Sequence, residues 1–125
     1  MAADPIQFVV RRPRHEAVQN PTVRIWLESP HTNLPLDCEV ELVDLSRQGA
    51  HLRLSRPVEP GESFLIRIQC EDAQLDVTLQ GIQRWQRTDG PEKWAVWCVF
   101  DEELGYELMG ELFLSGILDM EPAEE

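Results

Sequence analysis

A regular alternation of apolar and polar residues over residues 63–70 constrains this chain more than any other feature. Apolar side chains occupy every even position from Phe64 to Cys70, while the polar Arg67 and Gln69 occupy odd ones. Successive side chains of an extended strand point to opposite faces. The segment is therefore predicted to be a β-strand with one face in a hydrophobic core.

Further segments show strand character and are divided by turn signals. The other predicted strands are residues 22–29, 38–44 and 50–55, a segment from 75 that can continue to 87 with a bend at Gly81, and 94–100. Proline and glycine punctuate the intervals, as at Pro57, Pro60 and Gly61. The last segment is apolar along most of its length, which is typical of a strand covered on both sides.

From Asp101 onwards the apolar period becomes that of a helix. Apolar residues recur at i, i+3 and i+4 spacing at Leu104, Leu108, Met109, Leu112, Phe113, Ile117 and Leu118. Acidic residues at 101–103 suit a helix N-terminus, so a helix is predicted over about residues 101–119. The pattern predicts a mainly β fold, a six-stranded antiparallel barrel with a C-terminal α-helix across it.

Length and charge narrow the classes of protein that are possible. The 125 residues suffice for one domain with a single core. We expect an N-terminal extension at 1–10, one domain at 11–119 and an acidic tail at 120–125. The formal net charge of −12 repels polyphosphate, so no DNA or RNA partner is expected.

Hydropathy and cysteine spacing indicate neither a membrane anchor nor a metal site. No apolar run approaches the roughly 18 residues of a membrane span, and the first residues lack the features of a secretory signal. We therefore expect a cytoplasmic protein without membrane insertion. Cys38, Cys70 and Cys98 are widely spaced and have no histidine at metal-ligand spacing. They are predicted to be buried thiols, and neither a metal nor a cofactor is expected.

The segment Asp44-Leu45-Ser46-Arg47-Gln48-Gly49 joins two predicted strands. Asp and Ser side chains bond nearby amides in turns, and Gly permits positive φ, so a hairpin connection is one interpretation. Upstream, Arg11, Arg12 and Arg14 form a basic spot in an acidic chain. A second interpretation is that these arginines and the turn together hold an anionic, base-bearing ligand.

These features together resemble the PilZ domain family. Val43 to Ala50 is similar to that family's Asp/Asn-x-Ser-x-x-Gly turn. Arg11-Arg12 stands where the family carries Arg-x-x-x-Arg, but the motif is incomplete here, because His15 and Glu16 occupy the positions four residues on. The resemblance covers about residues 8–115, and further segments in the expected order are 60–62, 81–85 and 94–100.

The resemblance implies a receptor for the bacterial messenger cyclic di-GMP. Its arginines would contact phosphates and guanines, since guanidinium forks fit phosphate oxygens and the guanine O6/N7 edge. The Asp and Ser of the turn would bind a guanine. The implied ligand-binding residues are Arg11, Arg12, Arg14, His15, Asp44, Ser46 and Gly49. Ordering of the arginine segment would change the conformation and signal to a partner effector protein.

The main alternative is a PilZ-like adapter that does not bind the nucleotide and acts through protein contacts. Its candidate surfaces are the terminal helix with its acidic face and the strand that carries Trp97. An enzyme is not indicated, because the chain lacks a nucleophile–base–orienter set and a phosphate-binding glycine loop. His31 and His51 are expected at ordinary surface or strand positions. The four tryptophans are expected in the core or at its rim, although Trp85, beside Arg84, could also lie near the site.

Overall fold

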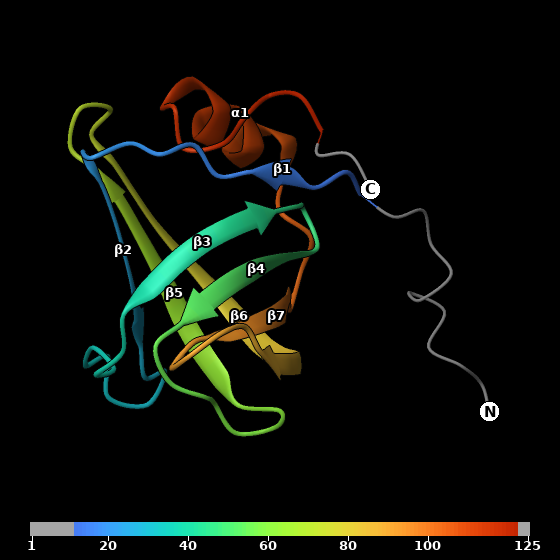
Figure 1. The fold of residues 1–125 in the computed structure, drawn as a ribbon. Helices are drawn as coiled ribbons and strands as arrows, with labels where there is room; N and C mark the ends of the chain where they lie inside the picture. Colours follow the sequence, from blue (N-terminus) through green and yellow to red (C-terminus); the bar gives the residue numbers. More distant parts are fainter. Residues whose placement is uncertain (1–11, 123–125) are drawn as a thin grey trace.

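One antiparallel sheet forms the body of the computed structural model, which describes residues 12–122 (Figure 1). The order of its strands is β1-β3-β4-β7-β6-β5-β2. The elements are β1 (His15–Glu16), β2 (Val23–Glu28), β3 (Val40–Leu45), β4 (Gly49–Leu54), β5 (Ser63–Cys70), β6 (Leu75–Thr88), β7 (Trp94–Phe100) and α1 (Tyr106–Leu114).

The curled sheet encloses the core on its concave side, and the mainly β prediction is confirmed. Strand β5 pairs with β2 on one side and β6 on the other. Its side chains Phe64, Ile66 and Ile68 are completely buried, as the alternation predicts. The curl brings β2 into contact with β3, and α1 lies across one end of the sheet (Figure 1).

The short strand β1 was not predicted, because two residues carry no period. It pairs with the end of β3, with Glu16 opposite Asp44. On its other side the amide of Val18 donates to the carbonyl of Ile117 and the amide of Asp119 to that of Glu16, both at 2.9 Å. The N-terminal lead-in is thus held between the sheet and the C-terminal segment.

The helix is shorter than the predicted range 101–119 at both ends. Before it, Leu104 donates its amide to a hairpin carbonyl instead of entering a helical turn, and Gly105 is extended with ψ of 156°. After Leu114 the chain reaches Gly116 in the left-handed region, with φ of 79°. Such a residue ends helices and favours glycine. Periodicity alone overestimated the helix because apolar residues outside it also reach the core.

Two of the three cysteines are buried as predicted. Cys70 and Cys98 lie in the core, and burial raises the pKa of the Cys98 thiol to about 12. Such a thiol stays protonated and unreactive at neutral pH. Cys38 corrects the prediction, because it is only half-buried, just before β3.

Candidate functional site

The β3–β4 hairpin is held rigidly by its own polar groups. The Ser46 amide donates to the Gly49 carbonyl at 2.9 Å, and the Ser46 hydroxyl accepts from the Gln48 amide at 3.0 Å. Ser46 is only 2% exposed. Its side chain therefore shapes the turn, as the hairpin interpretation expects.

Close packing explains the glycine of the turn. A Cβ on Gly49 would lie 2.3 Å from the carbonyl oxygen of Cys98 and 2.9 Å from the ring of Trp97. The expected need for positive φ does not apply, since the glycines with positive φ are at other positions in the described chain. Gly49 lets β4 approach β7 and so fixes where the hairpin lies.

Asp44 is the most enclosed carboxylate of the hairpin, with 7% of its surface exposed. Its Oδ2 lies 3.4 Å from Nδ1 of His51 and 4.0 Å from a terminal guanidinium nitrogen of Arg14. Its Oδ1 is buried and has no hydrogen-bond partner in the described part of the chain. An unsatisfied buried acceptor costs about 1–3 kcal/mol, so this oxygen is suited to N–H donors from outside the chain.

The arginine lead-in lies against this hairpin. Arg12 donates from Nε to Glu103 at 3.0 Å, and its amide lies 3.4 Å from the side-chain oxygen of Gln48. Arg14 faces Asp44 as described above. Arg11 falls outside the described residues. The structure therefore brings two of the three arginines of the predicted site to the Asp-Ser turn.

His15 lies elsewhere. It is buried, its Nδ1 is 2.8 Å from the carbonyl of Asp119, and its ring meets Phe113 edge-on at 4.7 Å between centroids. These contacts fasten the lead-in to the C-terminal segment. A ligand contact from His15 stays a prediction that these contacts do not favour.

Arg47 was not predicted as part of the site. Its Nε donates to the carbonyl of Leu104, and its guanidinium lies 3.6 Å from Glu103 and 3.8 Å from the ring centre of Tyr106. The Glu103 carboxylate is thus shared between Arg12 and Arg47. The signal was present, since Arg47 lies inside the turn motif, but its partners are distant in sequence.

His51 and Trp85 complete the outer face beside Asp44. His51 is paired with Asp44 across the β3–β4 ladder. Its ring centre lies 5.7 Å from that of Trp85, and its Nε2 is buried without a partner among the described residues. His51 was expected at an ordinary surface or strand position, whereas Trp85 was noted as a tryptophan that could lie near the site. Alternation along β4 could have identified His51, because it lies two residues after Gly49.

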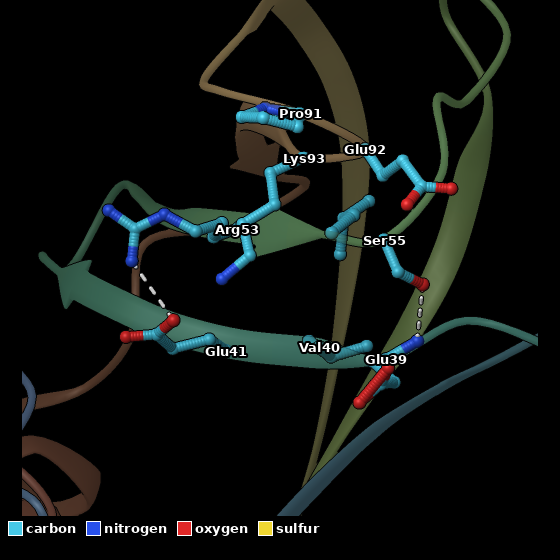
Figure 2. Close-up of a pocket in the computed structure, with 9 residues that line it drawn as sticks. Glu39, Val40, Glu41, Arg53, Ser55, Pro91, Glu92 and Lys93 are labelled. Carbon is cyan, nitrogen blue, oxygen red and sulfur yellow. Dashed lines mark hydrogen bonds and ion pairs between the residues drawn. The ribbon is translucent and has the colours of Figure 1, made fainter.

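A groove lies at the other end of the same hairpin (Figure 2). It encloses about 460 Å³ and is lined by Glu39, Val40, Glu41, Arg53, Leu54, Ser55, Pro91, Glu92 and Lys93. Arg53 binds Glu41 at 2.9 Å and Asp89 at 2.8 Å, and its bond to Asp89 lowers the pKa of that carboxyl. The groove is therefore not basic, and the chemistry expected of the site lies beside Asp44 instead.

Residues 12–122 contain neither a cluster of metal ligands nor a membrane-spanning helix. No group of three or more His, Cys, Asp or Glu residues there could hold a metal ion. No helix in that range has the length and apolar character to cross a membrane.

Fold and hairpin together define a small curled-sheet domain in which arginines lie over a buried Asp-Ser turn. A family model of the PilZ domain matches residues 10–112, and the chain belongs to the PilZ family. PilZ domains are receptor or adapter domains, and the family is known for binding cyclic di-GMP. No curated protein matches the chain.

Proposed function

We propose that this domain is a cyclic di-GMP receptor that acts in the cytoplasm and signals to an effector protein. The observation that carries the proposal is the buried, unpaired Oδ1 of Asp44 beside Arg14. Membership of the PilZ family indicates cyclic di-GMP as the ligand. The unpaired oxygen of Asp44 is the reason for placing a hydrogen-bond donor of that ligand here.

The chemistry of the ligand matches these groups. A guanine presents N1–H and N2–H₂ as adjacent donors, and the Asp44 carboxylate accepts from them, with Oδ1 available. The planar guanidinium groups of Arg12 and Arg14, with Arg11, bind phosphate oxygens and guanine edges. Ser46 and Gly49 hold the turn in the geometry that presents Asp44.

Binding requires a rearrangement near Asp44, because its Oδ1 is enclosed. The Arg14 side chain is 40% exposed and that of His51 only 18%, so Arg14 is the neighbour that moves more readily. On binding, the guanidinium of Arg12 leaves the Glu103 carboxylate and pairs with a phosphate of the ligand. Since Glu103 precedes α1, release of this carboxylate transmits ligand binding to the helix and to the effector.

Calorimetric titration of the full chain with cyclic di-GMP tests the proposal. We expect micromolar or tighter binding that weakens by at least about tenfold in Arg14→Ala, because a charge-assisted contact is worth about 1.5–3 kcal/mol. The exposed Arg56→Ala variant is the matched control and should bind like the original chain. Absence of heat from a folded sample at high micromolar ligand would exclude the receptor.

The second candidate is an adapter that has lost the nucleotide. It is favoured by the pairing of Arg12 with Glu103 and by the burial of His15, which leaves the second motif position unable to reach Asp44 without unpacking. In that case the same titration shows no heat, and the outer surfaces of the fold carry the function.

A further inference from the structure

The outward face of α1 combines acidic and apolar side chains. Glu107, Glu111 and Leu114 follow i, i+4 and i+7 spacing and therefore lie on one side. Leu114 is 88% exposed, although it is the last residue of the helix and could have been polar. Gly110 lies between them, and a Cβ there would meet no atom within 4 Å. The fold therefore does not require glycine at a position where glycine weakens the helix.

A groove adjoins this face. It encloses about 310 Å³ between the end of α1 and the β5–β6 turn, and its lining residues are Ala73, Gln74, Leu75, Glu111, Leu114 and Ser115. Of its two leucines, Leu75 is half-buried and Leu114 is exposed. One apolar side chain from another molecule could be covered by these two leucines.

Charge around the groove has a single sign. The charged side chains of α1 and of the β5–β6 turn are Glu71, Asp72, Glu107 and Glu111. All four are exposed, and none forms an ion pair with a described residue. Unpaired carboxylates around an apolar centre favour a cationic partner and discourage an acidic one.

We propose that this surface, the α1 groove, docks a basic amphipathic segment of a partner protein. One apolar residue of that segment packs on Leu75 and Leu114, and its lysines or arginines face Glu107 and Glu111. The absence of a side chain at Gly110 allows the partner backbone to approach closely. This goes beyond nucleotide binding and holds whether or not the domain binds cyclic di-GMP.

The two ends of α1 lie at the two surfaces, one at the candidate site and the other at the α1 groove. The first residue of α1, Tyr106, lies against the guanidinium of Arg47. The last residue, Leu114, forms the groove. The helix α1 therefore extends from Arg47 of the β3–β4 turn to the proposed partner surface (Figure 1).

A fluorescein-labelled synthetic helical peptide of leucine and lysine in amphipathic spacing is the probe. Anisotropy of this peptide is titrated with the full chain at about 150 mM salt, where long-range attraction between exposed charges is largely screened. Leu114→Ser should weaken binding about tenfold, and Glu111→Lys about fivefold. The matched controls Leu34→Ser and Glu92→Lys make the same changes on exposed loops away from α1 and should leave the affinity unchanged.

A peptide of the same composition without amphipathic spacing separates docking from simple charge attraction. The proposal is overturned by equal binding of the two peptides, by equal losses in the α1 and control variants, or by no saturable binding. Amide shifts in ¹⁵N NMR spectra should centre on residues 107–114 and 71–75, and shifts centred elsewhere contradict it. Leu114 is exposed, so Leu114→Ser should keep the thermal midpoint and show that any loss reflects docking.

Discussion

Two acid–base pairs face each other across the same β3–β4 ladder, and they differ in how complete they are. Glu41 lies opposite Arg53 and Asp44 opposite His51, with a register irregularity between them. Arg53 binds Glu41 and also Asp89, and this cluster is largely exposed. In the second pair Asp44 is buried and His51 is half-buried, and each keeps a buried polar atom without a partner among the described residues.

The comparison separates a structural ion pair from a candidate binding group. An exposed pair completed within the chain contributes about 0–1 kcal/mol and offers a ligand little. A buried carboxylate with an open acceptor gains more from external donors, since they satisfy a group already removed from water. The 460 Å³ groove lies at the first pair, and the unpaired acceptor lies at the second. The unpaired acceptor, and not the volume of a groove, is the reason for proposing the binding site at Asp44.

The largest difference between the two pairs is expected when Asp44 or Glu41 is replaced by alanine. Asp44→Ala should weaken cyclic di-GMP binding about a hundredfold, because two charge-assisted hydrogen bonds to guanine are lost. Glu41→Ala should leave binding unchanged. Calorimetry of both variants measures this, and similar losses in the two would mean that Asp44 holds no special role.

The bases of the two pairs give a smaller effect. His51→Ala should weaken binding about fivefold, because the ring orients Asp44 through Nδ1. His51→Asn, which keeps a donor, should recover part of that loss, while Arg53→Ala should bind normally. A thermal midpoint lowered equally in both His51 variants, without rescue of binding by Asn, would assign the residue a packing role only.

Removal of the Glu103 carboxylate, which competes with the ligand for the arginines, should strengthen cyclic di-GMP binding instead of weakening it. Glu103→Gln should tighten binding about threefold, because Arg12 and Arg47 lose a carboxylate that a phosphate must displace. The adjacent Glu102→Gln removes an equal charge and serves as the control. Equal effects would indicate net charge rather than competition.

The smallest expected effect concerns the ion pair between Arg53 and Asp89 and its loss at low pH. Arg53 lowers the pKa of Asp89 in the folded state, so ionised Asp89 favours folding. This contribution is present above the unfolded pKa near 4 and is lost as pH falls through the lower folded value. The free energy of unfolding falls between about pH 5 and about pH 2 as this contribution is lost. In Asp89→Asn it should fall slightly less over the same range. Urea denaturation measures it, with the exposed Asp72→Asn as control.

The strands were predictable because each carries its own period. The register of β5 follows from alternation within eight residues, and its burial pattern repeats that alternation. The start of the helix was not predictable, because the amide of Leu104 donates a hydrogen bond to the distant β3–β4 hairpin. Such a contact leaves no local trace in the sequence.

The candidate site was partly predictable for the same reason. Asp44 and Ser46 lie in one turn, so a short pattern identified them. Glu103 and His51 act through neighbours that folding alone brings close. His15 shows the converse, since a position in a motif does not determine the direction of its side chain, which β1 turns towards Phe113.

The pairing of β1 with the C-terminal segment has a consequence for how the domain opens. Residues 16–18 and 117–119 share backbone hydrogen bonds, so neither stretch can leave the sheet edge while the other keeps its partners. The amide protons of Val18 and Asp119 should then show the same protection against exchange with solvent, once each rate is divided by its intrinsic value. Any event that peels the arginine lead-in away would also loosen the residues that follow α1, and the two ends of the domain would respond as one.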